Sequence, residues 1–319
     1  MTRAIPDVGL DILDAAGLDV EVYSGELAPD RATLLERVRG CVGLLTLVTD
    51  RVDAELLDAA GPQLRVVANY AVGYDNIDVD ACTARNVAVT NTPDVLTEAT
   101  ADHAFALLLA VARRVLEGDA LVREDRWRGW GPKQLLGRDI GGQTLGIVGL
   151  GRIGTAVARR ARGFGMTVLY HNRSRDDEAE ARLGVRYAPD LHDLLARSDA
   201  ISIHVPLSEQ TRHLIGAEAL KAMPPHAILV NTARGPIVDE KALVRGLEHH
   251  HLWGAGLDVF EREPEVEAGL RRLPNVVLAP HTGSATHGAR NAMADLAATS
   301  IVQVLRGERP SNILNPTSV

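Results

Sequence analysis

Short apolar runs and segments with helical spacing alternate along the first part of the chain. The apolar runs are short enough to be buried strands, and they lie at residues 20–23, 42–48, 64–69 and 87–90. Segments with apolar residues three and four positions apart predict helices, and they lie at residues 8–16, 30–39 and 54–60. Strands and helices in alternation are typical of an α/β unit with a parallel sheet. We therefore predict one such domain over residues 1–95.

The start of the chain departs from this alternation. Residues 1–6 lead directly into the predicted helix at 8–16, so the strand expected before that helix is absent or reduced to about three residues. Because an inner strand carries ladder hydrogen bonds on both edges, its loss would leave backbone groups without partners. The sequence therefore predicts a weakened first domain.

A second alternation follows a long helix predicted at 97–122, for which Thr97 and Thr100 are candidate caps. Apolar runs predict six further strands, at 145–148, 166–170, 200–204, 227–231, 254–257 and 276–278. Parallel strands with intervening helices indicate a doubly wound sheet. A last helix is predicted at 286–305, ahead of Gly307.

The first strand of this second alternation runs into a glycine-rich turn. The turn, Gly149-Leu150-Gly151-Arg152-Ile153-Gly154, matches G-x-G-x-x-G, and helical spacing follows it. Gly149 permits the turn, Gly151 lets the backbone approach a pyrophosphate, and Gly154 lets the helix pack on the strand. The N–H groups of the helix N-terminus then face the anion. A purely structural turn is the alternative, and the flanking strand and helix favour a dinucleotide site.

The residues after the second strand bear on which dinucleotide is bound. NAD sites usually place Asp or Glu about 20 residues after the glycines, where it binds the ribose 2′-hydroxyl. Here the segment is His171-Asn172-Arg173-Ser174-Arg175, with no acid before Asp176. Hydroxyl and guanidinium donors suit a 2′-phosphate. We therefore predict that NADP is preferred over NAD, with a solvated loop as the alternative interpretation.

Together these patterns predict an α/β protein with two Rossmann-like or flavodoxin-like domains. The dinucleotide-binding domain, residues 96–285, is inserted into a split substrate domain made of residues 1–95 and 286–319. We expect the substrate to meet the nicotinamide in the cleft between the two domains.

Composition narrows the class of protein. The net charge of −8 argues against nucleic acid as a partner. The longest apolar run, 105–112, is far shorter than the roughly 18 residues of a membrane helix. No signal-peptide pattern is present, so we expect a cytoplasmic protein. Cys41 and Cys82 have no metal-binding spacing, and buried free thiols are a better interpretation than a disulfide.

Three charged residues follow late strands of the predicted second sheet. Arg234 follows the strand at 227–231, Glu263 follows the next strand, and His281 follows the last. Ligands of open α/β sheets bind at this edge. Taken singly, these residues have simple alternatives: Arg234 as a surface cation, Glu263 as a solvated acid and His281 as a cap.

Together the three residues suit the reduction of a ketone. Hydride transfer needs a proton donor for the developing alkoxide, and histidine titrates in the useful range. A neighbouring carboxylate favours the charged imidazole and orients its ring. An arginine can bind the carboxylate of a 2-oxo acid by paired hydrogen bonds. No metal is needed in this chemistry.

Several ordered motifs resemble the D-isomer-specific 2-hydroxyacid dehydrogenase family, and within it the glyoxylate/hydroxypyruvate reductases. The motifs span nearly the whole chain and comprise residues 69–78, 91–97, 149–154, 170–174, 231–235, 256–264, 280–287 and 290–293. The resemblance implies NADPH- or NADH-dependent reduction of small 2-oxo acids such as glyoxylate and hydroxypyruvate. It implies that His281 is the acid/base, Glu263 its partner, and Arg234 the group that binds the substrate's carboxylate and carbonyl.

The resemblance also implies binding roles for other residues. Backbone N–H groups of Val72 and Gly73 would bind the substrate carboxylate, and Leu45 would shape the pocket. Besides the glycine turn and Asn172 to Ser174, the implied cofactor residues are Thr100, Thr232, Ala233, Asp258, His281 and Gly283 for the nicotinamide half, and Val205, Pro206 and Thr211 for the adenine side.

The family resemblance further implies a homodimer formed through the nucleotide domain. In the reductase branch, a tryptophan before that domain can reach the partner's active site. Trp130 matches that position better than Trp127. We therefore predict that Trp130 caps the neighbouring substrate pocket, with an ordinary interface aromatic as the alternative.

Three other functions remain for comparison. One is a dehydrogenase for a D-2-hydroxy acid with a larger side chain, because loops set the pocket size. Phosphoglycerate dehydrogenase is less favoured, since no regulatory domain follows residue 319. The third is a nucleotide-sensing binding protein resembling the corepressors of this fold, for which an added peptide-binding segment would be expected.

Overall fold

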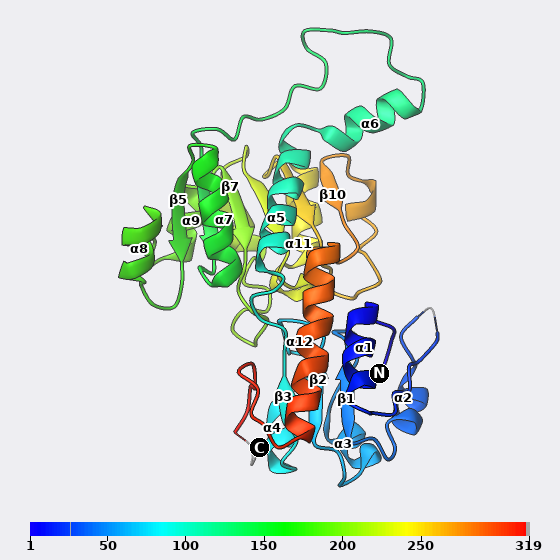
Figure 1. Cartoon of the computed structure of the whole chain (residues 1–319). Helices are drawn as coiled ribbons and strands as arrows, with labels where there is room; N and C mark the ends of the chain where they lie inside the picture. Colours follow the sequence, from blue (N-terminus) through cyan, green and yellow to red (C-terminus); the bar gives the residue numbers. More distant parts are fainter. Residues whose placement is uncertain (26, 317–319) are drawn as a thin grey trace. The chain divides into compact units, whose positions relative to one another are not determined.

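The chain folds into two units, which the computed structural model describes over residues 1–25 and 27–316 (Figure 1). One unit combines Met1–Leu96 with Ser284–Val319, and the other is Thr97–Gly283. The first unit is thus assembled from both ends of the chain, and the second from its uninterrupted middle. Residues 317–319, the end of the predicted segment 286–319, lie outside the described residues.

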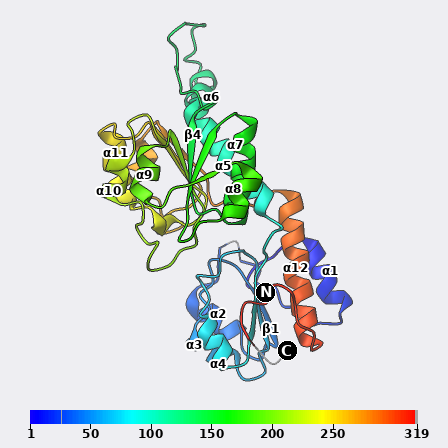
Figure 2. The same cartoon turned by 90° about the vertical axis from the view of Figure 1, so that its left-hand side faces the viewer.

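The first unit is built on a parallel three-stranded sheet in the order β1-β2-β3. Its strands are β1 (Gly43–Thr46), β2 (Val66–Asn69) and β3 (Ala88–Thr90). Its helices are α1 (Asp7–Ala15), α2 (Arg31–Arg37), α3 (Ala54–Ala60), α4 (Val79–Ala84) and α12 (His287–Leu305). Helices α2, α3 and α4 pack on one face, and α12 lies beside α1 on the other (Figure 2). The predicted parallel α/β unit is confirmed.

The strand predicted at 20–23 is wrong, and residues 1–6 contain no strand. The backbone N–H of Thr2 donates to Leu45 at 3.1 Å, and the N–H of Tyr23 donates to the Met1 carbonyl at 3.0 Å. Residues 1 and 2 therefore lie where a longer strand would pair. Because a ladder needs several successive partners, the segment at 20–23 stays irregular.

The second unit is built on a parallel seven-stranded sheet in the order β10-β9-β8-β7-β4-β5-β6. The strands are β4 (Thr144–Val148), β5 (Thr167–His171), β6 (Arg186–Tyr187), β7 (Ala200–Ile203), β8 (Ile228–Asn231), β9 (Gly254–Leu257) and β10 (Val276–Leu278). The six predicted strands are confirmed, and the two-residue edge strand β6 was too short to predict. The order reverses between β4 and β7, which is where open α/β sheets bind ligands.

Most helices of the second unit cover the two faces of its sheet, while the helix over residues 115–123 buries no side chain. The helices of this unit are α5 (Thr97–Ala112), α6 (Val115–Arg123), α7 (Arg152–Gly163), α8 (Asp177–Leu183), α9 (Leu191–Ala196), α10 (Ala217–Ala222) and α11 (Glu240–Glu248), with short 3-10 helices η1 (Gly235–Ile237) and η2 (Leu270–Arg272). Side chains of α5, α7 and α8 pack on one face, and those of α9, α10 and α11 on the other. The doubly wound architecture is confirmed.

The single helix predicted at 97–122 is wrong, because the chain breaks it into α5 and α6. Arg114 has a left-handed backbone with φ of 52°. The carbonyl of Ala112 accepts a hydrogen bond from the N–H of Arg138 at 2.7 Å, and a Cβ on Gly137 would lie 2.2 Å from that carbonyl oxygen. A segment from further along the chain therefore takes the place of the next helical turn.

Both cysteines are free thiols, as predicted, but only Cys82 is buried, while Cys41 is partly exposed. Burial raises the pKa of the Cys82 thiol to about 12. Among the described residues, no helix is long and apolar enough to span a membrane.

We expect His204 to make the second unit sensitive to acid. Its ring contacts the Ser202 hydroxyl at 2.8 Å, and burial lowers the pKa of His204 to about 3. In the unfolded chain histidine binds a proton near pH 6.5, so folding must release that proton and stability falls as the pH drops below that value. Between about pH 7 and 5 the loss should reach up to about 2 kcal/mol.

The measurement is thermal unfolding of the wild type and His204→Gln at several pH values. Glutamine does not titrate, so the variant should lose less stability on acidification than the wild type. Parallel acid dependence in the two proteins would contradict the assignment.

Candidate active site

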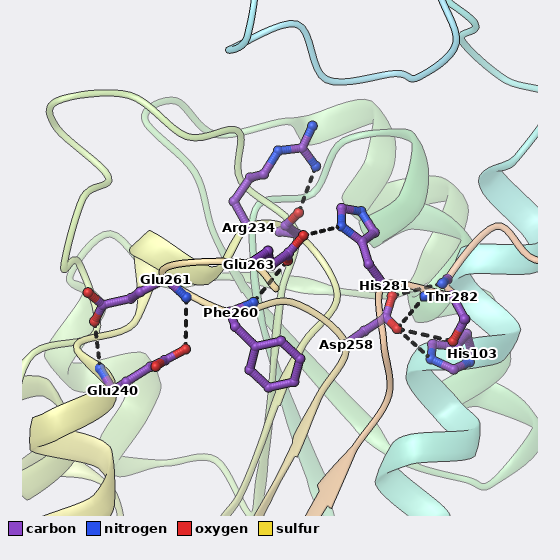
Figure 3. A network of polar contacts seen from close by, with 11 residues as sticks. His103, Arg234, Glu240, Asp258, Phe260, Glu261, Glu263, His281 and Thr282 are labelled. Atoms are coloured by element: carbon purple, nitrogen blue, oxygen red, sulfur yellow. Dashed lines mark hydrogen bonds and ion pairs between the residues drawn. The ribbon is translucent and has the colours of Figure 1, made fainter. Parts of the chain in front are cut away.

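Arg234, Glu263 and His281 lie in the loops that follow β8, β9 and β10 (Figure 3). These strands are neighbours in the sheet, so their carboxyl ends bring the three loops to one edge. The prediction that the three residues lie in loops after late strands of this sheet is therefore confirmed, and the topology makes those strands neighbours.

Glu263 and His281 form a direct pair. The Nδ1 atom of His281 lies 2.8 Å from the Glu263 Oε2 atom, and each side chain is about one third exposed. The other carboxylate oxygen of Glu263 accepts a hydrogen bond from the backbone N–H of Phe260 at 3.0 Å. A proton on Nδ1 directed at the carboxylate leaves Nε2 as the ring nitrogen for a substrate.

The backbone of His281 is held in an unusual conformation. Its φ is 55°, in the left-handed region that non-glycine residues seldom adopt. Its N–H donates to the carbonyl of Asp258 at 2.8 Å. Backbone strain of this kind persists where surrounding contacts impose it, and it is frequent at functional sites.

Asp258 supplies those surrounding contacts. Its side chain is 1% exposed, and its carboxylate accepts hydrogen bonds from the backbone N–H groups of Thr282 and Gly283, each at 2.7 Å. The Nε2 atom of His103, on α5, lies 3.1 Å from the same carboxylate. Asp258 thus holds the backbone of His281 and of the two residues that follow it. Sequence reasoning missed His103, because only the packing of α5 places it here.

Arg234 leaves the sheet through a turn shaped by Asn231. The Asn231 side chain accepts from the N–H of Ala233 at 3.0 Å and donates to the Arg234 carbonyl at 2.9 Å. The guanidinium of Arg234 donates to the Ala233 carbonyl at 2.9 Å. The turn therefore sets the direction in which the arginine side chain leaves β8.

The glycine turn after β4 has the shape that a pyrophosphate requires. Gly149 has φ of 99°, and a Cβ on Gly154 would lie 2.2 Å from the Gly149 carbonyl oxygen. A Cβ on Gly151 would meet no atom within 4 Å, so the space above the turn is open. The twelve-residue helix α7 begins at Arg152, and its N-terminus can bind an anion.

The residues after β5 divide between structural and exposed positions. The side chain of Asn172 accepts a hydrogen bond from the N–H of Leu150 at 2.8 Å and so braces the glycine turn. Arg175, one of the donors that the sequence predicts for a 2′-phosphate, instead pairs with Asp177 and Glu180, each at 2.8 Å. Arg173 and Ser174 are exposed.

Two of the predicted nicotinamide residues, Gly283 and Thr100, lie near Asp258. A Cβ on Gly283 would lie 3.0 Å from the Asp258 carboxylate and 3.4 Å from the Thr100 methyl group. The buried hydroxyl of Thr232 has no hydrogen-bond partner within the part of the chain that the structure describes. A buried polar atom of this kind calls for a missing partner, so these residues fit a polar ligand such as a nicotinamide.

On the predicted adenine side, Thr211 holds a turn together. Its hydroxyl donates to the Pro206 carbonyl at 2.7 Å and accepts from the N–H of Ser208 at 2.8 Å. Thr211 therefore shapes the loop after Val205 through these bonds.

The predicted substrate residues of the first unit lie on its sheet and the loop after β2. Leu45 is buried in β1. The carbonyls of Val72 and Gly73 accept from the side chains of Asn91 and Asn69, at 2.8 and 2.9 Å. These asparagines orient the backbone of the loop. Trp130 lies in the second unit and is 83% exposed.

Comparison with known proteins assigns this arrangement to a family. The NAD-binding-domain model of the D-isomer specific 2-hydroxyacid dehydrogenases matches residues 105–283. The chain belongs to the D-isomer specific 2-hydroxyacid dehydrogenase family. It is 52% identical to a glyoxylate reductase of Thermococcus litoralis over 319 residues, which is 99% of this chain and 96% of the relative.

Solved structures of dehydrogenases and related proteins agree with this membership. A protein from Thermus thermophilus is 48% identical, with a TM-score of 0.93 and 98% of each chain covered. An NADPH-dependent glyoxylate/hydroxypyruvate reductase from Sinorhizobium meliloti, solved with NADP and malonate, is 36% identical with a TM-score of 0.86. The match covers 98% of this chain and 94% of that one. This dehydrogenase is therefore an oxidoreductase that uses a nicotinamide cofactor.

Proposed function

We propose that this dehydrogenase reduces small 2-oxo acids, glyoxylate and hydroxypyruvate first, to the corresponding 2-hydroxy acids. The observation that carries the proposal is the 2.8 Å contact between His281 and Glu263, with Arg234 on a neighbouring loop. Close relatives are named glyoxylate reductases, including one from Pyrococcus furiosus that is 51% identical.

His281 is the proton donor in this proposal. A bound reduced nicotinamide supplies the hydride for the carbonyl carbon of the substrate. The carbonyl oxygen then gains negative charge, and a proton on His281 Nε2 neutralises it. Glu263 accepts from Nδ1 at 2.8 Å, so it orients the ring and stabilises the imidazolium before transfer.

Arg234 and the first unit bind the acid. A guanidinium matches a carboxylate through two parallel hydrogen bonds, and we assign that role to Arg234. The backbone N–H groups of Val72 and Gly73 are further donors to the same carboxylate, and Leu45 limits the size of the side chain that the substrate can carry.

We propose three regions for the cofactor. The glycine turn and the N-terminus of α7 bind the pyrophosphate, and Val205, Pro206 and Thr211 line the adenine side. The nicotinamide half is bound by Thr100, Thr232, Ala233, Asp258 and Gly283, together with His281. Arg173 and Ser174 bind a ribose 2′-phosphate, so NADPH is preferred over NADH.

The test is steady-state oxidation of NADPH and NADH with glyoxylate, hydroxypyruvate and pyruvate. Faster turnover of the first two acids with NADPH would support both assignments. Faster turnover with NADH would contradict the role of Arg173 and Ser174. Turnover of bulkier 2-oxo acids alone would favour a different dehydrogenase, and nucleotide binding without any turnover would favour a corepressor-like binding protein.

We also propose a cytoplasmic homodimer formed through the second unit. Helix α6 and the segment after it expose large apolar side chains: Val115, Leu116, Val122, Trp127, Trp130 and Leu136. Apolar groups gathered on one projecting element are typical of a surface that a partner covers. A second copy of the chain is the partner that we propose.

Trp130→Ala tests whether the partner's tryptophan caps the substrate pocket. We expect the KM for hydroxypyruvate to rise about tenfold, with the KM for NADPH unchanged and the dimer intact by light scattering. Trp127→Ala is the matched control and should leave both constants near the wild-type values. Equal effects of the two substitutions would mean that Trp130 is an ordinary interface aromatic.

A further inference from the structure

Two glutamates near the candidate site hydrogen-bond to each other's backbone. Glu240 is the first residue of α11, and Glu261 lies in the loop after β9. The N–H of Glu240 donates to the Glu261 carboxylate at 2.8 Å, and the N–H of Glu261 donates to the Glu240 carboxylate at 2.8 Å. Figure 3 shows this reciprocal pair, which we call the glutamate clasp, beside Glu263 and His281.

The clasp is electrostatically costly. Glu240 is 5% exposed, and burial raises its pKa while Glu261 and Glu267 add negative charge nearby. The Nε2 atom of His213 lies 3.3 Å from the Glu261 carboxylate, and the Arg262 guanidinium lies 3.7 Å from that of Glu267. Two carboxylates brought together out of water oppose each other's ionisation. The hydrogen bonds of the two carboxylates to backbone N–H groups must therefore offset this electrostatic cost.

Capping of α11 does not explain the clasp. The helix already has an N-cap, because the side chain of Asp239 accepts from the N–H of Ala242 at 2.9 Å. That bond satisfies a free N–H of the first turn in the usual way. Glu240 instead directs its carboxylate away from its own helix, to the loop that follows β9.

This loop carries the candidate carboxylate. Glu261 lies between Phe260, whose N–H donates to Glu263 at 3.0 Å, and Glu263 itself, which contacts His281 at 2.8 Å. The hydrogen bond between Phe260 and Glu263 closes a turn over residues 260–263. The clasp holds the backbone of Glu261 inside that turn. Movement of the loop would change the distance between Glu263 and His281.

The clasp also connects this loop to the turn of Arg234. A Cβ on Gly235 would lie 1.8 Å from the carbonyl carbon of Phe260, so the two backbones are in direct contact there. The chain then runs through η1 to Asp239 and Glu240. The contact at Gly235 and the clasp at Glu240 hold the loops after β8 and β9 together at two points.

We propose that Glu240 and Glu261 are positioning residues for the reduction. They hold Glu263 against His281, and they hold the turn of Arg234 at a fixed position relative to that pair. The inference rests on the proposed function for its kinetic consequence. Its structural consequence, the placement of Glu263 beside His281, holds for any reaction at this site.

The experiment compares Glu240→Ala, Glu261→Ala and the double variant with the wild type. Each alanine variant should lower kcat for glyoxylate about tenfold, with little change in the KM for NADPH. The alkaline limb of the pH profile of kcat/KM should move to lower pH, because an imidazolium with a displaced carboxylate loses its proton more readily. The double variant removes both hydrogen bonds of the clasp, so its kcat should fall at least as far as that of either single variant, but by less than the product of the two single effects, because the bonds support the same loop.

Two further variants separate positioning from general damage. Glu240→Gln keeps an oxygen that can accept from the N–H of Glu261, so it should restore wild-type kinetics. Asp239→Ala removes the N-cap of α11 without touching the loop after β9, so it should lower the melting temperature and leave the pH profile unchanged. A pH profile displaced equally by Asp239→Ala, or left unchanged by both glutamate-to-alanine variants, would overturn the proposal.

A measurement that does not depend on turnover separates the test of the clasp from the test of the proposed function. The ring resonances of His281, identified by their absence in His281→Gln, can be followed by NMR against pH. Their titration midpoint should fall in Glu240→Ala and Glu261→Ala but not in Asp239→Ala. Failure of the wild type to reduce any 2-oxo acid would reject the proposed function, and an unchanged midpoint would reject the clasp.

Discussion

His281→Gln should lower kcat for glyoxylate by about 10²- to 10⁴-fold, the range typical of a lost general acid. Glutamine keeps a polar side chain of similar length but has no proton to transfer to the carbonyl oxygen. The KM for NADPH should change little, because the residues proposed to bind the cofactor's phosphates and ribose lie in other loops. Steady-state kinetics with saturating NADPH measures both constants.

Glu263→Gln completes this test, because Glu263 acts through His281. An amide can still accept from Nδ1 but carries no charge to stabilise the imidazolium. We expect a smaller fall in kcat, and an alkaline limb of the pH profile that moves to lower pH. The double variant His281→Gln, Glu263→Gln should be close to His281→Gln alone, since residues that act as a unit are not additive.

His226 provides a matched control for these variants. Its Nε2 atom lies 2.7 Å from the Asp199 carboxylate, so this histidine–carboxylate pair has a contact like that of His281 and Glu263. Asp199 precedes β7 and His226 precedes β8, at the opposite edge of the sheet from the candidate site. His226→Gln should leave kcat unchanged. A loss of activity similar to that of His281→Gln would mean that the histidine substitutions act through stability.

The second large effect is expected at the ribose end of the cofactor site. Arg173→Asp should lower kcat/KM for NADPH about 10- to 100-fold, because a charge-assisted bond to a phosphate is lost and an acid faces the dianion. The same aspartate can accept from a ribose 2′-hydroxyl, so the value for NADH should stay level or rise. The ratio of the two kcat/KM values measures the preference.

Arg175→Ala is the control for this prediction. Arg175 lies two residues away but is paired with Asp177 and Glu180. Removing it should cost a little stability, as exposed ion pairs do, and should leave the ratio between the cofactors unchanged. An equal loss of preference in Arg175→Ala would assign the effect to the net charge of the loop, and not to a phosphate contact at Arg173.

Local chemistry explains why the sequence predicted so much of the second unit. Both faces of a parallel sheet are covered, so its buried strands are apolar on both sides and a short apolar run predicts them. The glycines at 149, 151 and 154 were interpretable because each has a steric requirement that acts over a few residues. Prediction from local sequence was wrong for residues 20–23 and for the helix break at Arg114. The hydrogen-bond partners that decide these two segments are Met1, Thr2 and Arg138, which are distant from them in sequence.

The candidate site shows the same division. From the sequence alone, residue chemistry and position after successive strands determined the parallel α/β fold, the dinucleotide turn and the candidates Arg234, Glu263 and His281. Only the tertiary structure decided that the His281 Nδ1 atom meets Glu263 and that Arg175 is occupied by acids. It alone brought His103 to Asp258 and Glu240 to Glu261. Such contacts join residues far apart in the chain, and no local pattern of apolar and polar positions encodes them.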